Sequence, residues 1–337
     1  MIKWKKFRVF LGIIISIFFL LLAFKGLNIS KLLHILKGED PFLSITVILL
    51  TGLQYIIRTV RWRFLLDHIK RCSFQSRFSS IIIGFGANCI FPMRVGELIR
   101  ANYLSKIEKL SASSAFGSIV TERLFDGIAI LSFLSIGLYL MPLSGRFKHI
   151  REELAISGSI LFLLFLLSLS IIVGLKKKEK TVIKILDRFL FFTGEYLRKR
   201  ILEGILNFSK GIVSLGSPYR IYLTLILSYL LWGLSLVQIF LICRSLQISI
   251  PFRATFTVLT MATLGVSVPS GPGFIGTFHI SVQYALILLG IGKEEALSAA
   301  ILWHGCFFFP TLFLALSVII LNHIPFKTLI KFSPTSS

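Results

Sequence analysis

Residues 113–141 read SSAFGSIVTERLFDGIAILSFLSIGLYLM, and Glu122, Arg123 and Asp126 are the only charged residues in this run. A transmembrane helix needs about 20 mostly apolar residues, so the run is long enough to cross a bilayer. Glu122 and Asp126 are four residues apart and share one face of a helix. Helical rise would place Glu122 about 13 Å inside the apolar layer, where a charge is costly and indicates a functional site.

The composition of the whole chain agrees with a membrane protein. Of its 337 residues, 55% are hydrophobic, only 15% are charged, and 32 are Phe. A soluble protein of this length could not cover so much apolar surface, which excludes soluble enzymes, nucleic-acid-binding domains, disordered chains and disulfide scaffolds. The four cysteines are scattered without a CxxC pair, so we expect packing residues rather than a zinc site or a disulfide framework.

Five further apolar runs are long enough to span a membrane, at residues 9–24, 42–57, 154–175, 219–243 and 295–323. The first follows a basic start and lacks a clear cleavage site, so we interpret it as a retained anchor. The sequence therefore predicts an all-α polytopic integral membrane protein with about six full transmembrane helices, and a single transmembrane domain over residues 1–337.

Two more apolar stretches, at residues 79–103 and 254–291, are interrupted by proline and glycine. Both contain a proline followed four residues later by glycine, at Pro92 and Gly96 and at Pro269 and Gly273. Interrupted segments in corresponding places of two halves indicate a binding site near the bilayer midplane. We predict two broken or re-entrant helical hairpins, with an inverted repeat as a hypothesis and pairs of ordinary kinked helices as the alternative.

The distribution of charge predicts the orientation. Most of the 37 Lys and Arg residues lie at the N-terminus, in residues 58–77, in residues 176–220 and in the C-terminal tail. Cytoplasmic loops are rich in Lys and Arg, so these groups and both termini are predicted to be cytoplasmic, and the two hairpins then enter from opposite faces. The net charge of +22 thus marks orientation, and no nucleic-acid partner is expected. Residues 175–217 are predicted to form a basic amphipathic cytoplasmic loop on the inner leaflet, or a solvated connector.

The first interrupted stretch, IIIGFGANCIFPMRVGELIRANYLSK at 81–106, carries Asn88, Arg94, Glu97 and Arg100. We expect Pro92 to end one half-helix and a second to begin near Arg94, so that Arg94, Glu97 and Arg100 follow one another along one side. A helix N-terminus beside arginines suits a phosphate group. These charges balance those of residues 113–141, so the alternative is a structural network of buried ion pairs.

The second interrupted stretch, SVPSGPGFIGTFHISVQYAL at 267–286, contains Pro269, Ser270, Gly273, Thr277 and His279. We predict an unwound loop whose backbone groups can act as ligands, with Thr277 as the cap of a new half-helix and His279 in its first turn. A helix break without a ligand is the alternative. His304 stands alone in an apolar run, where an internal hydrogen bond or a proton-coupling role are the two interpretations. The sequence contains no nucleotide-binding, metalloprotease or hydrolase motif, and we expect no metal and no cofactor.

Four motifs in order make the chain resemble the lysylphosphatidylglycerol synthase transmembrane-region family, the flippase-like domain of multiple peptide resistance factor proteins. The motif residues in this sequence are Asn88, Pro92, Arg94, Gly96, Glu97 and Arg100; Glu122, Arg123, Leu124, Asp126 and Gly127; Pro269, Ser270, Pro272, Gly273, Gly276, Thr277 and His279; and His304 with Pro310. The resemblance implies translocation of lipids between leaflets, with aminoacylated phosphatidylglycerol as the best-known cargo. Bifunctional relatives continue into a second membrane block and an aminoacyl-tRNA-dependent transferase domain, which we do not expect of this chain.

The sequence therefore predicts a lipid translocase of a bacterial or archaeal cell membrane that is not an enzyme. Its expected partner is an anionic or aminoacylated phospholipid, with a homo-oligomer left open. The phosphate of the head group is expected near Arg94, Arg100 and Arg123. Two alternatives remain: an integral-membrane enzyme that uses the buried carboxylates as acid and base, and a non-catalytic membrane protein that recruits partners through its basic loop.

Overall fold

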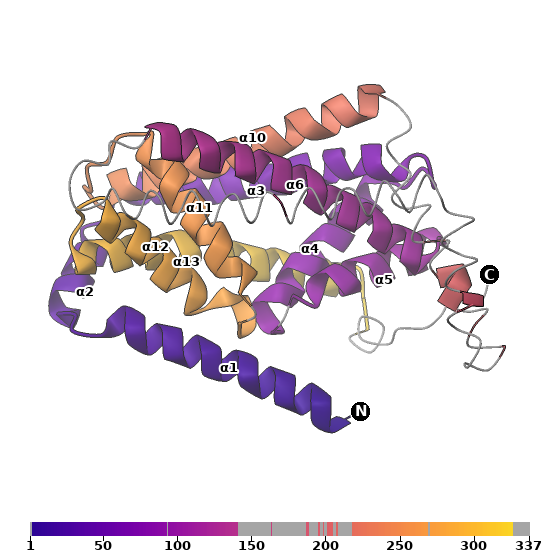
Figure 1. The fold of residues 1–337 in the computed structure, drawn as a ribbon, viewed down its shortest axis with the longest axis horizontal. Coiled ribbons are helices and arrows are strands. Elements are labelled where there is room, and N and C mark those ends of the chain that lie inside the picture. Colours follow the sequence, from indigo (N-terminus) through magenta and orange to yellow (C-terminus); the bar gives the residue numbers. More distant parts are fainter. Residues whose placement is uncertain are drawn as a thin grey trace.

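A computed structural model describes residues 2–92, 94–140, 218–268 and 270–325, together with residues 163, 187, 188, 195, 198, 201–204 and 207. This described part of the chain consists of helices and contains no strand, as predicted (Figure 1). The predicted span at residues 154–175 and the predicted basic loop at residues 175–217 lie almost wholly outside it.

Three described helices are long and apolar enough to cross a membrane: α3 (Pro41–Leu66), α10 (Pro218–Ser245) and α13 (Lys293–Leu321). A fourth helix, α6 (Ala112–Leu140), is equally long and differs in carrying three charges near its middle. The N-terminal helix α1 (Ile2–Phe24) bends by 89° into the short helix α2 (Ile29–Lys37). In sequence position, α1, α3, α6, α10 and α13 coincide with five of the six predicted spans, and three of the described helices, or four with the bent pair, are long and apolar enough to cross a membrane.

Helix α3 and helix α10 pack side by side in antiparallel directions. At one end the Asp40 amide donates to the Ser245 carbonyl (3.0 Å), and near the other end Arg61 donates to the Ser228 hydroxyl (2.6 Å). The start of α3 is fixed locally, because the Asp40 side chain accepts from the Phe42 amide (2.9 Å) and Pro41 occupies the first helical position. The antiparallel packing places the C-terminal ends of α3 and α10 at opposite ends of the bundle.

Each of these two helices leads into one of the interrupted stretches. After α3 come α4 (Phe74–Ile90) and α5 (Gly96–Glu108), broken at residues 91–95; after α10 come α11 (Ala254–Ser267) and α12 (Thr277–Leu288), with the short 3-10 turn η3 (Pro272–Phe274) between them. Helices α4 and α5 pack on each other, as do α11 and α12. Both predicted broken hairpins are therefore present, and they enter the bundle from opposite ends.

The breaks fall close to the predicted positions but differ in detail. The first half-helix ends at Ile90, before Pro92, and the second begins at Gly96 rather than near Arg94. Arg94 thus stands in the connection with a φ of 53°, so the predicted face shared by Arg94 and Glu97 does not form. Thr277 is the first residue of α12, and the capping position belongs to Gly276 with a φ of 95°; glycine reaches that backbone conformation without steric cost.

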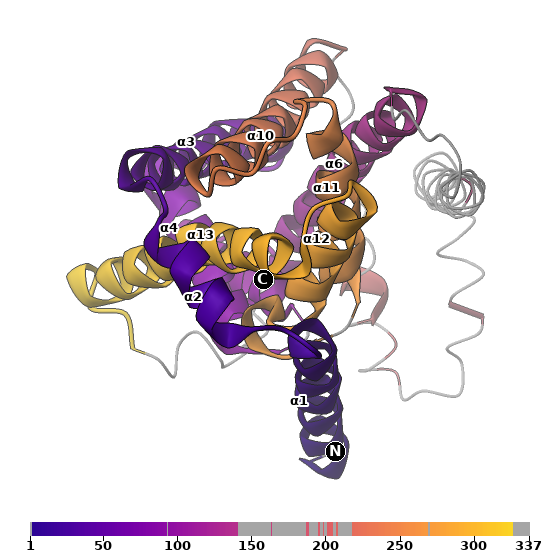
Figure 2. The same ribbon diagram turned by 90° about the vertical axis from the view of Figure 1, so that its left-hand side faces the viewer.

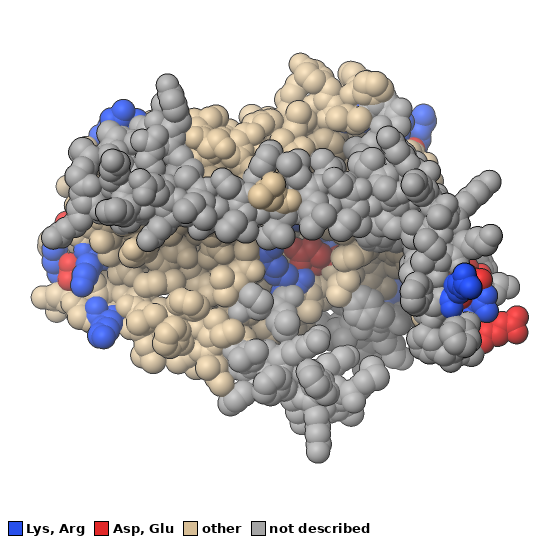
Figure 3. Space-filling model, in the orientation of Figure 1, with Lys and Arg blue, Asp and Glu red and all other residues tan. Residues whose placement is uncertain are grey.

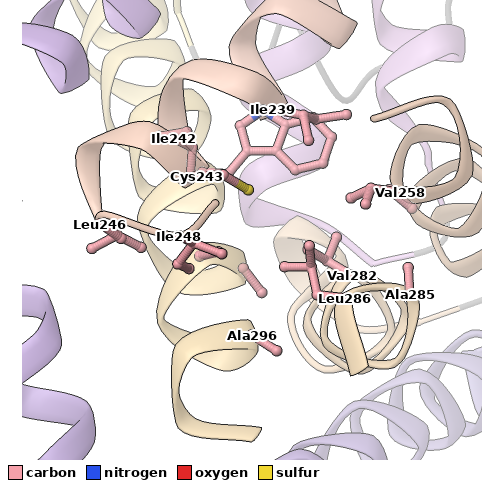
Figure 4. Packing of buried hydrophobic residues seen from close by; sticks show 14 of the residues in the cluster. Ile239, Ile242, Cys243, Leu246, Ile248, Val258, Val282, Ala285, Leu286 and Ala296 are labelled. Atoms are coloured by element: carbon pink, nitrogen blue, oxygen red, sulfur yellow. The ribbon is translucent and has the colours of Figure 1, made fainter. Parts of the chain in front are cut away.

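An apolar core joins the second hairpin to α10 and α13. Ile239 and Ile242 of α10, Val258 of α11 and Leu286 of α12 are at most 2% exposed, and they point into one cluster with Ala296 of α13 (Figure 4). Because these side chains come from four helices, the cluster fixes the hairpin against the long spans. Many large apolar side chains on the outer helix faces are exposed, among them Phe42, Leu49 and Phe313, as expected of surfaces that meet lipid.

Candidate functional site

A network of five charged side chains joins α3, α5 and α6 inside the bundle. The Glu122 carboxylate accepts from Arg100 at 2.8 Å and lies 3.0 Å from Arg61 and 3.3 Å from Arg123. The Arg100 guanidinium also stacks on Trp62, with 3.7 Å from its central carbon to the ring centroid. Arg61 and Glu122 have no exposed side-chain surface and Arg100 has 2%. Three arginines thus enclose one carboxylate, which compensates for its burial.

Asp126 extends the same network by one helical turn. Its Oδ1 accepts from Arg61 (2.5 Å) and from the indole of Trp232 (3.0 Å), while its Oδ2 accepts from Arg61 (3.3 Å) and lies 3.2 Å from Arg123. Four contacts leave this carboxylate little capacity for a ligand. The predicted pairing of buried charges holds for Arg100 and Arg123 with Glu122 and Asp126, whereas Arg94 and Glu97 form no ion pair in the described part of the chain. Arg61, from the segment at residues 58–77 that is predicted to be cytoplasmic, is an additional partner.

Next to this network lies a cavity of about 320 Å³. Its lining residues come from α3, α4, α5, α6, α10, α11, α12 and α13 and from the two breaks. Figure 2 shows the arrangement of these helices in a view along the bundle. Its charged or ionisable lining residues are Arg58, Arg94, Glu97, Arg123, Asp126 and His304; its other polar residues include Thr51, Gln54, Asn88, Ser235, Gln238, Thr263 and Ser267; and its aromatic residues are Phe85, Trp232, Phe274, Phe278, Trp303 and Phe307. The cavity combines cations, neutral hydrogen-bonding groups and aromatic faces.

The charges of the cavity are reachable from the side of the bundle. The Arg123 side chain is 36% exposed, and Arg94 is exposed. Figure 3 shows blue and red atoms together near the middle of one face, with tan atoms on both sides and apart from the charges at its two ends.

The tips of the two hairpins meet beside the cavity. Arg94, in the first break, donates to the Val266 carbonyl at the end of α11 (2.8 Å), and its guanidinium lies 5.3 Å from the ring centroid of Phe274 in the second break. These contacts hold Arg94 in a left-handed backbone conformation that costs about 1–2 kcal/mol for a residue with a side chain. The arginine therefore joins the hairpins instead of pairing with Glu97.

Asn88 fixes the turn of the first hairpin. Its side-chain oxygen accepts from the Gly96 amide at the start of α5 (2.8 Å), and its side-chain nitrogen lies 3.5 Å from Glu97. Gly96 packs directly on Gly84 of α4, because a Cβ atom on Gly96 would lie 2.0 Å from the Gly84 carbonyl oxygen. Asn88 is thus a cap supplied by the preceding helix, and it orients Glu97 at the cavity wall.

The second break is held by two histidines. His304 of α13 donates from Nε2 to the Gly273 carbonyl (2.8 Å), and His279 accepts from the Gly276 amide at Nδ1 (3.3 Å). The two rings pack edge to face with centroids 4.8 Å apart. Both histidines therefore stabilise the backbone of the loop, in agreement with the interpretation of His304 as an internally bonded residue, and His304 also lines the cavity.

Helix α1 covers the outer side of this loop. The Ser16 hydroxyl accepts from the Gly271 amide (2.8 Å), and a Cβ atom on Gly276 would lie 2.3 Å from the Ser16 carbonyl oxygen. Ser270 is buried at the same contact, and Thr277 donates to the Phe274 carbonyl (3.3 Å). Pro269 lies outside the described residues. The predicted loop residues thus serve the backbone and the α1 contact.

The predicted site residues divide into three groups. Asn88, Arg94, Glu97, Arg123, Asp126 and His304 line the cavity; Arg100 and Glu122 lie in the ion-pair network behind it; and Ser270, Gly273, Thr277 and His279 shape the second break. The sequence interpretation missed Arg58 and Arg61, since it ended the span at Ile57. Residues 53–66 contain no proline or glycine that would end the helix at Ile57, and this was the signal that could have found them.

Comparison with known proteins identifies the family. The model of the lysylphosphatidylglycerol synthase transmembrane region matches residues 9–315, so the chain belongs to this membrane-protein family. It is 27% identical to a UPF0104 membrane protein of Methanocaldococcus jannaschii, over 83% of this chain and 85% of that protein. It is 25% identical to a UPF0104 membrane protein of Pyrococcus horikoshii, over 87% of this chain and 90% of that protein. It is also 21% identical to Glycosyltransferase AglD of Haloferax volcanii, over 87% of this chain but 51% of that protein.

Proposed function

We propose that this member of the lysylphosphatidylglycerol synthase transmembrane-region family translocates lipids between the leaflets of a cell membrane. The observation that carries the proposal is the cavity of about 320 Å³, which is lined by Arg58, Arg94 and Arg123 and lies beside the contact between the tips of two opposed broken hairpins. A volume of this order is at the lower end of ligand-binding pockets and suits a head group rather than a whole lipid.

The energetic need for such a cavity follows from the charge of the cargo. A phosphate that crosses an apolar layer without partners loses its hydration at a cost far above thermal energy. Arginine presents a planar fork of donors that matches phosphate oxygens. Cavity arginines would replace part of the lost hydration, and the acyl chains would remain in the surrounding bilayer during the passage.

The opposed hairpins supply the conformational element that translocation requires. Each hairpin enters from its own end of the bundle, and the two touch at Arg94, Val266 and Phe274. Discontinuous helices whose ends meet at a binding site are characteristic of alternating access. In the proposed cycle, separation of the tips on one side opens the cavity to one leaflet, and their reunion closes it. Both termini face the cytoplasm in this proposal.

The second candidate is an enzyme that acts on a lipid-linked substrate, which is favoured by the similarity to Glycosyltransferase AglD of Haloferax volcanii. Acid–base catalysis needs a carboxylate with a free oxygen at the substrate. Asp126 makes four contacts and Glu122 is enclosed by three arginines, so neither buried carboxylate has a free oxygen for this role. Of the two carboxylates that line the cavity, Glu97 alone has one. The translocase is therefore the better-supported proposal.

Reconstitution into lipid vesicles tests the proposal. Vesicles that contain acyl-chain-labelled phosphatidylglycerol are treated with an impermeant quencher, which bleaches the outer leaflet alone unless lipids move. The protein should make the inner-leaflet label accessible, with and without an imposed membrane potential, and Arg94→Ala should slow this by at least 10-fold. A rate equal to that of protein-free vesicles would refute translocation, and covalent change of the labelled lipid would favour the enzyme.

A further inference from the structure

Arg58 lines the cavity, and no ion pair or hydrogen bond of its guanidinium is found within the described part of the chain. Arg58 lies on α3 one turn before Arg61, and its guanidinium lies 5.1 Å from the ring centroid of Phe85. Its Nη1 atom is buried without a hydrogen-bond partner, and within the described part of the chain no carboxylate pairs with it. A buried guanidinium nitrogen without an acceptor costs free energy, so an anionic ligand that reaches it would be bound favourably.

The charge balance of the lining favours an anion as a whole. Arg58, Arg94 and Arg123 face the cavity, against the carboxylates Glu97 and Asp126. Asp126 is fully engaged by Arg61, Arg123 and Trp232, which leaves one carboxylate for a ligand. Arg123 is likewise paired with Glu122 and Asp126. A head group with an excess of positive charge would therefore meet the guanidinium groups of Arg58 and Arg94 and a single carboxylate, that of Glu97. A phosphate would instead meet more charges of opposite sign than of its own.

The cavity lining also provides neutral acceptors. Gln54 donates from Nε2 to the Leu231 carbonyl (3.0 Å), and Gln238 donates from Nε2 to the Thr51 hydroxyl (3.0 Å) and the Val47 carbonyl (3.4 Å). Because a backbone carbonyl can only accept, these contacts fix the orientation of both amides. Each side-chain oxygen is left over as an acceptor in a residue that lines the cavity.

Aromatic faces complete the lining. Trp232 and Trp303 line the cavity together with the two glutamines. Carboxamide oxygens accept hydrogen bonds from hydroxyl groups, and an aromatic face packs on the C–H groups between them. A head group made of hydroxylated carbons fits these neutral groups, whereas a bare phosphate or a methylated ammonium would leave the glutamine oxygens without donors.

From these three observations we infer that the cargo carries a phosphate next to neutral hydroxyl groups, as in a phosphoglycerol or a phosphosugar, and that Arg58 is the principal phosphate contact. An aminoacylated head group is not the preferred ligand. The inference rests on the proposed function for the passage between leaflets, while the assignment of the head group concerns binding to the cavity.

A head-group series with one acyl-chain label tests the assignment in vesicles. Phosphatidylglycerol should move at least 10-fold faster than phosphatidylcholine and lysyl-phosphatidylglycerol, and faster than phosphatidic acid. A polyprenyl-linked sugar phosphate, added as a separate arm, distinguishes a glycerolipid cargo from a sugar carrier; faster movement in either arm supports the inference. The inference would be overturned if neither phosphatidylglycerol nor the sugar phosphate moved faster than phosphatidylcholine and lysyl-phosphatidylglycerol.

Variants of one helix locate the contact. Arg58→Gln should lower the phosphatidylglycerol rate by at least 10-fold, Arg58→Lys should retain a larger fraction, and Arg63→Gln, on the exposed side of the same helix, should leave it unchanged. Gln54→Leu with Gln238→Leu should bring the rates of phosphatidylglycerol and phosphatidic acid together. A wild-type rate in Arg58→Gln would overturn the role of this arginine.

Binding in detergent separates this inference from translocation. Native mass spectrometry with short-chain phosphatidylglycerol, phosphatidic acid and phosphatidylcholine measures head-group preference without any movement. If phosphatidylglycerol binds more tightly than the other two lipids and Arg58→Gln weakens its binding at least 10-fold, the assignment of the head group is supported. If no lipid moves in vesicles at the same time, only the proposal of translocation is refuted. Binding that does not depend on Arg58, with a folded variant confirmed by its melting curve, contradicts the assignment.

Discussion

Arg61 of α3 donates hydrogen bonds to Asp126 of α6 from both of its terminal nitrogens. Nη1 lies 2.5 Å from Oδ1 and Nη2 lies 3.3 Å from Oδ2. Neither side chain is more than 3% exposed. The pair joins the helix that leads into the first hairpin to the helix that follows it, so it fixes the wall of the cavity from behind.

Arg61→Met is therefore expected to destabilise the fold. The change leaves two buried carboxylates short of a partner, and breaking a buried pair from one side costs about 3–5 kcal/mol. The four cysteines are buried, and burial raises the pKa of the Cys72 thiol to about 11, so a thiol-reactive dye reports unfolding. The melting temperature of Arg61→Met should fall well below that of the matched surface variant Arg63→Met. Equal melting temperatures would contradict the buried network.

Two carboxylates should respond differently to neutralisation. Glu122→Gln removes the charge that three arginines enclose and should lower thermal stability strongly. Glu97→Gln changes a cavity residue whose nearest side-chain partner is Asn88 at 3.5 Å, and should change stability little while it alters lipid movement. The same melting and vesicle assays measure both variants. A stable Glu122→Gln variant, or an unfolded Glu97→Gln variant, would contradict the assignment of Glu122 to the structural ion-pair network and of Glu97 to the cavity.

The close packing of α4 on α5 depends on Gly96, because there is no space for a side chain at this position. Gly96→Ala should destabilise the first hairpin by about 1–3 kcal/mol, because its Cβ would overlap the Gly84 carbonyl and the Asn88 side chain. The matched control is Gly52→Ala in α3, where nothing lies within 4 Å of the new atom. If the two variants melt at the same temperature, the close crossing is absent in the folded protein.

The opposed hairpins predict opposite accessibility for two exposed lysines. Lys109 follows α5 and Lys293 begins α13, just after the second hairpin. In intact cells, an impermeant thiol reagent should label Lys293→Cys from outside, whereas Lys109→Cys should react only after the membrane is opened. Labelling of both from one side would remove the opposed arrangement and the cytoplasmic placement of the first hairpin.

Much of this architecture could be predicted from the sequence, because the patterns that carry it are local. Apolar length located the spans, and proline with glycine located the breaks at residues 91–95 and 268–276. The pairing of Arg100 and Arg123 with Glu122 followed from charge balance inside an apolar frame. These features follow from the free-energy cost of unpaired charges and unpaired backbone groups in lipid, which does not depend on the particular fold.

The parts that could not be predicted depend on contacts between distant segments. Counting basic residues assigned Arg58 and Arg61 to a cytoplasmic loop, although a helix of 26 residues carries both into the bundle. The sequence also paired Arg94 with its neighbour Glu97, whereas the fold offers it the Val266 carbonyl of another hairpin. Helical spacing describes neighbours on one element, and these partners come from packing.

The most direct test of the central claim asks whether lipids pass through the cavity itself. Ser267 lines the cavity and is exposed, so a bulky, charged thiol reagent on Ser267→Cys should block the vesicle assay, and a reductant that removes it should restore the rate. The same reagent on Gln75→Cys, exposed at the start of α4, should have no effect. Lipid movement that continues unchanged through a modified Ser267→Cys would show that the cavity is not the path.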